Sequence, residues 1–241
     1  MEKRREKLFS DYFSSIFGSS NVFTEKEYGD ASAQFEINYG NFMPPQKDSK
    51  ILDIGCGTGH FLYYLKKKEY NNFLGIDVSI QQVNFCRENV SEHVERADVF
   101  EFLKDKKAIF DVIIANDLLE HIPKEGILKF LDLVHEGLKS EGIFLIKTPN
   151  LGNPFTLYLR YKDFTHEAGF TDKSLYQVLW TAGFRNIQVK PFKRHMDRSF
   201  KCFIESRLAQ IIVFILIKLF QIQGFVAPKI LTPLLLGIAK K

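Results

Sequence analysis

The chain has 241 residues, 45% hydrophobic and 26% charged, a composition typical of soluble globular proteins. This length accommodates one sizeable α/β domain with an extension, but is short for two full domains. Nine Lys/Arg against two Asp/Glu give residues 193–241 a net charge of +7, whereas 24 Lys/Arg against 27 Asp/Glu leave residues 1–192 at −3. A uniformly basic nucleic-acid binder is therefore disfavoured, and we expect no nucleic-acid partner.

Cysteine usage and the N-terminus bear on the compartment. Cys56, Cys86 and Cys202 are far apart and fit neither a disulfide framework nor a zinc motif. The first residues are mostly charged and lead into no apolar run of the signal-peptide type. We expect a cytoplasmic protein.

The chain divides into three parts. Residues 1–46 are predicted to form one or two amphipathic helices and a loop, which ends at Pro44-Pro45 because prolines break a helix. Residues 47–192 are predicted to form the main domain, and residues 193–241 a basic, apolar helical extension.

Within the main domain, short apolar runs alternate with helical stretches. Strands are predicted over 50–54, 73–78, 94–97, 110–115, 142–147 and 186–189. Helices are predicted from 59 to 68, over about 80–90, from 123 to about 139 and over 172–182. This alternation predicts an α/β fold with a doubly wound, mostly parallel sheet.

A glycine-rich turn, Asp53-Ile-Gly55-Cys-Gly57-Thr-Gly59, follows the first predicted strand. Such a turn lets a ligand approach the backbone at a helix N-terminus. His60 follows where a P-loop needs lysine, and the spacing differs from the G-x-G-x-x-G of dinucleotide folds. A carboxylate at Asp53 would also repel a pyrophosphate but attract the ammonium and sulfonium of S-adenosylmethionine.

Two more acids end the next two predicted strands. Asp77 ends the second, where a carboxylate accepts hydrogen bonds from both ribose hydroxyls, and Asp98 follows the third, near the expected adenine amino group. Each acid alone is more often a helix cap or a solvated loop residue. Three acids at the same sheet edge indicate an adenosyl-ligand site.

These motifs, together with Phe-Asp-Val-Ile-Ile-Ala-Asn-Asp-Leu-Leu-Glu-His-Ile-Pro at 110–123, resemble the ordered motifs of class I S-adenosylmethionine-dependent methyltransferases over roughly 48–192. The resemblance implies a Rossmann-like methyltransferase with S-adenosyl-L-methionine as cofactor. The residues that it places around the cofactor are Asp53, Gly55, Gly57, Gly59, Asp77, Val78, Asp98, Val99 and Asn116. The family's sheet has a seventh, antiparallel strand, for which 199–204 is the only weak candidate.

A polar loop between the fifth predicted strand and the next helix contains Asp163-Phe-Thr-His166-Glu167. An alcohol acceptor needs a base to take its proton, and His166 is the candidate, oriented by Asp163 or Glu167. Alternatively, the histidine only ties the loop to the sheet.

A second polar motif is Asp117-x-x-Glu120-His121. Some quinone-pathway and small-RNA methyltransferases carry Glu-x-x-Glu-His at this position and bind a divalent metal with it; otherwise the Glu-His pair braces a loop. Our leading prediction assigns no metal. At the exit of the fifth strand, Thr148 and Asn150 are expected to shape the acceptor pocket, although a turn fixed by Pro149 needs no ligand.

The segment from Thr148 to Phe184 resembles a bacterial subgroup associated with surface-polysaccharide and glycolipid assembly. The resemblance implies O-methylation of a sugar or lipid-linked glycan hydroxyl. The alternatives are a metal-assisted O-methyltransferase of a quinone or phenol at the membrane, and a cofactor-binding module without catalysis.

The extension contains two apolar stretches, 208–220 and 230–239. The first falls short of the roughly 20 residues that span a bilayer. With basic residues around them, we expect the segment 208–239 to contact the membrane peripherally, at the inner face of the cytoplasmic membrane. Alternatively, it forms a helical hairpin that packs on the open sheet edge or on a second subunit in a homodimer.

Overall fold

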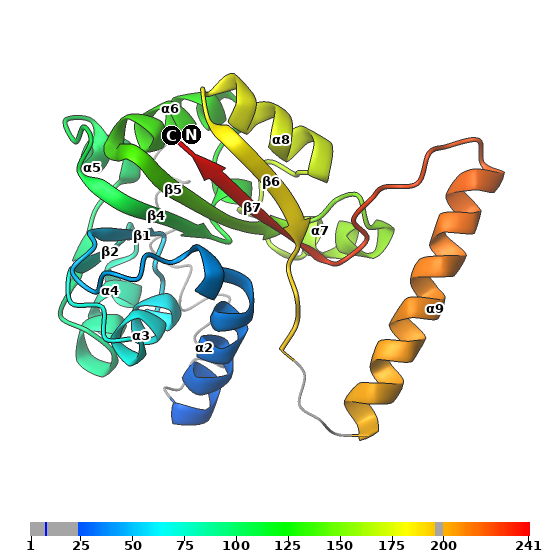
Figure 1. Cartoon of the computed structure of the whole chain (residues 1–241), viewed down its shortest axis with the longest axis horizontal. Helices are drawn as coiled ribbons and strands as arrows, with labels where there is room; N and C mark the ends of the chain where they lie inside the picture. The colour runs from blue at the N-terminus through cyan, green and yellow to red at the C-terminus, as the bar shows by residue number, and fades with distance from the viewer. Residues whose placement is uncertain (1–7, 9–23, 196–199) are drawn as a thin grey trace.

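The computed structural model describes residues 8, 24–195 and 200–241. Its centre is one seven-stranded sheet in the order β3-β2-β1-β4-β5-β7-β6, in which β7 runs antiparallel to the other six strands (Figure 1). The strands are β1 (Ile51–Ile54), β2 (Phe73–Asp77), β3 (Val94–Arg96), β4 (Phe110–Asn116), β5 (Leu138–Pro149), β6 (Arg185–Pro191) and β7 (Leu234–Lys240). The predicted fold class is confirmed, and all six predicted strands are present.

Helices cover both faces of the sheet (Figure 1). One layer contains α5 (Val99–Leu103), α6 (Ile127–Gly137) and α8 (Asp172–Thr181); the other contains α2 (Glu25–Tyr39), α3 (His60–Lys67) and α4 (Ile80–Asn89). Alternate residues of a strand point to opposite helix layers. Leu52 and Ile54 pack against the layer of α5, α6 and α8, whereas Ile51 packs against the layer of α2, α3 and α4. This two-residue period follows from the pleat, and burial on both faces explains the continuous apolar runs.

The seventh strand lies elsewhere than predicted. Residues 200–204 begin the helix α9 (Phe200–Ile222), and residue 199 lies outside the described part of the chain. The strand is instead β7, inserted between β5 and β6. Residues 235–239 are buried there, so the expectation that 230–239 lies at a membrane or in a helical hairpin is wrong for the strand. An apolar run is required because this strand is covered on both faces.

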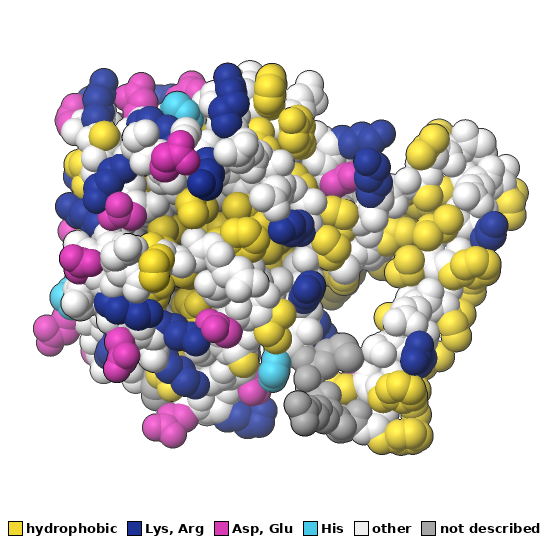
Figure 2. Space-filling view, in the orientation of Figure 1, with side chains coloured by type: hydrophobic (Ala, Val, Ile, Leu, Met, Phe, Trp, Pro, Cys, Tyr) yellow, Lys and Arg dark blue, Asp and Glu magenta, His cyan; other side chains and the backbone are white. Residues whose placement is uncertain are grey.

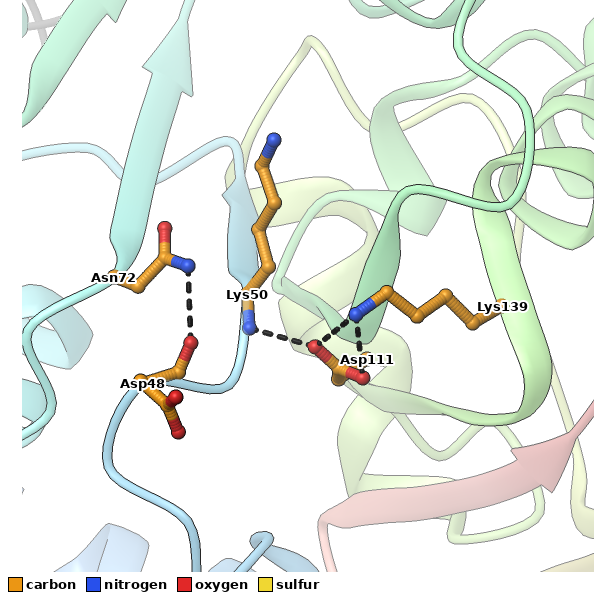
Figure 3. A network of polar contacts seen from close by, with 5 residues as sticks. All are labelled: Asp48, Lys50, Asn72, Asp111 and Lys139. Atoms are coloured by element: carbon orange, nitrogen blue, oxygen red, sulfur yellow. Dashed lines mark hydrogen bonds and ion pairs between the residues drawn. The ribbon is translucent and has the colours of Figure 1, made fainter.

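Polar contacts fix the end of the sheet at which the parallel strands begin (Figure 3). The Asp111 carboxylate accepts a hydrogen bond from the Lys50 backbone N–H at 2.7 Å and pairs with Lys139 Nζ at 2.8 Å. The Asn72 amide donates to the Asp48 carbonyl at 2.9 Å. These contacts join the entries of β1, β2, β4 and β5, far from the edge where the glycine turn lies.

The two flanking segments differ in their packing. Of the predicted N-terminal helices, α2 is present and packs on α3, whereas residues 1–7 and 9–23 lie outside the described part. The helix α9 stands away from the body (Figure 1). No helix among the described residues is long and apolar enough to cross a membrane.

Candidate active site

A cavity of about 760 Å³ opens at the carboxyl ends of β1, β2, β4 and β5 and is covered by α2. Its size lies within the range of small-molecule sites, which run from roughly 300 to 1,000 Å³. Among the residues predicted around the cofactor, it is lined by Asp53, Gly55, Gly57, Asp77, Val78, Val99 and Asn116. From the predicted acceptor side it is lined by Asp117, Glu120, His121, Asp163 and His166.

The glycines of the turn have two different roles. Gly55 and Gly57 line the cavity, and Gly57 has a φ of +55° that favours glycine. Gly59 is not part of the cavity wall: a Cβ there would lie 2.5 Å from the sulfur of Cys86 on α4. Gly59 therefore has a packing role, because α4 approaches the turn too closely for any side chain, and its cofactor contact stays a prediction.

Asp53 is a buried carboxylate whose two oxygens have no hydrogen-bond partner among the described residues. Burial raises its pKa well above the usual value, and the nearby Asp77 adds to this effect. An uncompensated carboxylate is costly in such a position. A cationic ligand group in the cavity would supply the missing partner, which fits the ammonium of S-adenosylmethionine.

Asp77 connects the second strand to the glycine turn. Its carboxylate accepts hydrogen bonds from the backbone N–H of Gly57 at 2.9 Å and of Ser79 at 2.8 Å. Burial nevertheless raises its pKa. Because each carboxylate oxygen can accept a further hydrogen bond, Asp77 can hold the turn and still bind ribose hydroxyls.

Asp98 does not line the cavity. Its side chain caps α5 instead and accepts hydrogen bonds from the N–H groups of Phe100 at 2.9 Å and Glu101 at 3.3 Å. Ala97 and Val99 form the cavity wall on either side of it. The adenine contact of Asp98 stays a prediction, and the wall here is apolar.

The helix α2 supplies a part of the site that sequence reasoning missed. Gln34 and Phe35 line the cavity, and the Tyr39 hydroxyl donates to the Asn116 side-chain oxygen. The Asn116 amide nitrogen is buried and has no partner among the described residues. The available signal was the aromatic stripe formed by Tyr28, Phe35 and Tyr39, which lie on one face of the helix.

His166 is held at the cavity by backbone contacts. Its Nδ1 lies 2.8 Å from the Leu159 carbonyl oxygen, and Arg160 donates to the carbonyls of His166 and Glu167. A carbonyl only accepts, so Nδ1 carries the proton and Nε2 the lone pair. The expected orientation by Asp163 or Glu167 is thus replaced by orientation through a carbonyl.

Asp163 acts through its neighbour Thr165. Its carboxylate accepts from the backbone N–H and the hydroxyl of Thr165, at 2.9 and 2.6 Å. The same hydroxyl oxygen lies 2.8 Å from Nδ1 of His121. Since the hydroxyl proton goes to Asp163, the His121 Nδ1 donates, and its Nε2 carries the lone pair.

Glu120 lies between the two histidines and the sheet. It is 2% exposed and accepts a hydrogen bond from the Thr148 hydroxyl at 3.0 Å. Burial, reinforced by Asp117, raises its pKa to about 8. Burial beside His166 lowers the pKa of His121 to about 4.

These residues form a compact group of potential metal ligands. One ligand atom each from Glu120, His121 and His166 lies within 4.8 Å of the others. Asp117, the first residue of the predicted metal motif, is not in this group and forms an ion pair with Lys147 at 2.5 Å. The sequence motif suggested Asp117 as the third metal ligand, whereas in the structure His166 is the third member of the group.

The residues after β5 have structural roles. Thr148 and Asn150 are buried and do not line the cavity, so the expectation that they shape the acceptor pocket is wrong. The Asn150 amide donates to the carbonyls of Ile230 and Thr232, at 2.9 and 2.8 Å. Asn150 therefore anchors the segment that leads into β7, and the neighbouring Lys147 and Pro149 line the cavity instead.

The sheet order, the glycine turn and the uncompensated Asp53 together define an α/β protein that binds a cationic adenosyl ligand. A family model described as a methyltransferase domain matches residues 33–189, which is more than half of the chain. The chain belongs to this family and is a class I S-adenosylmethionine-dependent methyltransferase with S-adenosylmethionine as its cofactor.

Several characterised proteins are similar. Phosphoethanolamine N-methyltransferase 1 of Arabidopsis thaliana is 28% identical over 212 residues, which cover 81% of this chain and 39% of that protein. Cyclopropane-fatty-acyl-phospholipid synthase of Escherichia coli K12 is 30% identical over 102 residues, 41% of this chain and 26% of that protein. The chain thus spans well under two thirds of the length of these relatives.

Solved structures support the fold. A SAM-dependent methyltransferase from Archaeoglobus fulgidus superposes with a TM-score of 0.67 at 23% identity, covering 98% of this chain and 99% of that one. Phosphoethanolamine N-methyltransferase 2 of Haemonchus contortus, in complex with S-adenosyl-L-methionine, gives a TM-score of 0.60 at 16% identity, covering 97% of this chain and 60% of that one.

Proposed function

We propose that the protein methylates a hydroxyl group of a sugar or a lipid-linked glycan. The observation that supports this most directly is His166, whose Nδ1 is fixed on the Leu159 carbonyl while the residue lines the cavity. An amine acceptor attacks with its own lone pair, whereas a hydroxyl gains from a base that takes its proton. His166 Nε2 carries the lone pair for this step.

Each part of the cavity has its own role in methyl transfer. S-adenosylmethionine supplies a methyl group on a positively charged sulfur, which is already activated for displacement. Asp53 compensates the ligand's ammonium, Asp77 holds the ribose, and α2 forms one wall of the cavity. Positioning the acceptor oxygen in line with the methyl group then accounts for most of the catalysis.

The test is transfer of a labelled methyl group into fractionated glycolipids and polysaccharides of the host. We expect label in a glycan-containing fraction that resists mild acid, as an ether does, and a loss of transfer with His166→Gln. Label in an amine-containing headgroup fraction would overturn the proposal. Cofactor binding without transfer to any fraction would instead favour a module without catalysis.

A second candidate is metal-assisted O-methylation of a quinone or phenol, favoured by the group Glu120, His121 and His166. In metal sites each histidine usually has its other nitrogen hydrogen-bonded, as both are here through Leu159 and Thr165. Chelation separates the candidates: loss of activity that magnesium restores favours the metal, and full activity after chelation favours His166 as the base.

A further inference from the structure

The helix α9 has an unusual surface. It is 23 residues long, and none of its side chains is buried. Eight of its large apolar side chains are at least half-exposed, namely Phe200, Phe203, Leu208, Ile211, Phe214, Ile215, Leu219 and Ile222, whereas Leu216, Ile217 and Phe220 are partly buried. Figure 2 shows this apolar surface along the helix. Exposed apolar area of this extent marks an interaction site.

From Arg207 onwards the polar side chains of α9 keep to one stripe, whereas Lys201 and Glu205 near its start lie on the opposite side of the helix. Arg207, Gln210, Lys218 and Gln221 are spaced by three residues or by sums of three and four, so they share one face of the helix. The rest of the circumference is mainly apolar. A broad apolar sector with a narrow polar stripe suits a helix that lies in the plane of a membrane interface.

A second exposed apolar group borders the cavity. Phe155, Tyr158, Tyr161 and Phe164 are 65%, 69%, 75% and 87% exposed. From the same stretch, which includes α7 (Leu157–Lys162), Leu159, Lys162, Asp163 and His166 line the cavity. One wall of the cavity thus has a polar inner side and an aromatic outer side, as is common where proteins meet a lipid headgroup layer.

The two apolar groups are joined through one anchored segment. Asn150 and Asn153, just before α7, donate to the carbonyls of Ile230 and Leu231 in the connection from α9 to β7. In Figure 1 this connection runs beside α7. The connection that follows α9 is therefore anchored at the cavity wall.

Charge distinguishes between the surfaces that could cover α9. The helix carries Lys201, Arg207 and Lys218 against one acid, Glu205, which already lies within 4.0 Å of Lys201 and 3.8 Å of Arg194. Two copies of α9 packed together would bring these unbalanced cations near one another, which is unfavourable. An anionic surface complements them.

We propose that α9 and the exposed aromatic side of residues 155–164 dock together on an anionic lipid bilayer, with the cavity wall of α7 facing the membrane. The sequence predicted a membrane contact over residues 208–239. Because β7 is buried in the sheet, the proposed contact keeps only α9 from this segment and adds α7. The inference deepens the proposed function, since it makes the acceptor a lipid-linked glycan. Lipid binding is measured without methyl transfer, so the two can fail separately.

The experiment is flotation of the full chain with vesicles of phosphatidylcholine alone or mixed equally with phosphatidylglycerol. We expect binding to the anionic vesicles that weakens as salt is added. Leu208→Glu should weaken it by about tenfold, because an apolar side chain no longer enters the lipid. Tyr161→Ser/Phe164→Ser should weaken it by about threefold or more, through lost interfacial aromatic contacts.

Leu128→Glu on α6 is the matched control, because Leu128 is 44% exposed on another part of the surface. This variant should bind vesicles as the wild type does, and all variants should bind S-adenosylmethionine equally. No flotation of the wild type, or equal flotation of Leu208→Glu and wild type, would overturn the proposal. So would a stable dimer that Leu208→Glu dissociates in the absence of lipid, which would assign α9 to a second copy.

Discussion

The two halves of the cavity are built in different ways. The cofactor half comes from contiguous backbone, in which the turn 53–59 is held by Asp77 and leaves the carboxylate of Asp53 uncompensated. The acceptor half is assembled from side chains far apart in sequence, with His121 joined to Thr165 and His166 oriented by Leu159. The cofactor half is thus already arranged to bind a positively charged ligand group. In the acceptor half, the protonation states of the hydrogen-bonded side chains decide which group can act as a base.

The largest effect is expected in the acceptor half. His166→Gln removes the proposed base, so kcat should fall by about 10²–10⁴-fold. Calorimetry should find S-adenosylmethionine binding nearly unchanged, since the cofactor half does not depend on this ring. A variant that loses both activities would show that the two halves are not separable. Asp163→Asn, which keeps the loop's shape, should lower kcat less.

The next effect concerns the stability of the cofactor half. Gly59→Ala places a methyl group 2.5 Å from the Cys86 sulfur at a φ of +89°. Strain and overpacking should lower the free energy of unfolding by about 2–4 kcal/mol. Urea unfolding measures this, with Gly29→Ala as the control because a Cβ there has no atom within 4 Å. Equal destabilisation by both variants would contradict the packing role of Gly59.

Asp53→Asn tests the uncompensated carboxylate. Losing a charge-assisted contact to the cofactor's ammonium should weaken S-adenosylmethionine binding by about 10–100-fold. The ligand-free variant should be more stable than the wild type at pH 8, because the raised pKa of Asp53 means that its ionisation destabilises the fold. An unchanged affinity for S-adenosylmethionine, measured by calorimetry, would contradict the proposed contact between Asp53 and the cofactor.

The most gradual effect is the pH dependence caused by Glu120, which is spread over several pH units. Its pKa in the folded protein is about 8, above the ordinary value of 4.5, so between these values the folded state keeps a proton that the unfolded state has lost. The contribution of Glu120 to the free energy of unfolding should therefore fall as pH rises, by at most about 1.4 kcal/mol per pH unit. Glu120→Gln should flatten this slope in urea titrations from pH 5 to 8. Parallel curves for variant and wild type would contradict the assignment.

The difference between the halves also explains what the sequence could predict. Asp53, Gly55, Gly57 and Asp77 lie next to predicted strand ends, and parallel strands bring such ends to one edge, so their placement followed from local pattern. The pairing of Glu120 and His121 with His166 depends on contacts across about 45 residues, which no local pattern encodes. The sequence accordingly pointed to Asp117 as the third ligand.

Two residues predicted to contact ligands have structural roles with one physical origin. Asp98 and Asn150 are polar residues at strand exits, as Asp77 is, yet one caps α5 and the other anchors the connection to β7. Short polar side chains satisfy backbone groups as readily as they bind ligands. The strand β7 was missed because Thr232, Pro233 and Gly237 interrupt its apolar pattern and because α9 separates it from β6.

The place of β7 has a consequence for how the protein is made. This strand follows the other six strands of the sheet in sequence and yet pairs on both sides, with β5 and β6. Until residues 234–240 have left the ribosome, both partners present open edges, and the sheet cannot close. A chain cut after residue 192 would keep every cofactor residue and still lack a strand inside the sheet. Synthesis therefore completes α9 before the enzyme that carries it can finish folding.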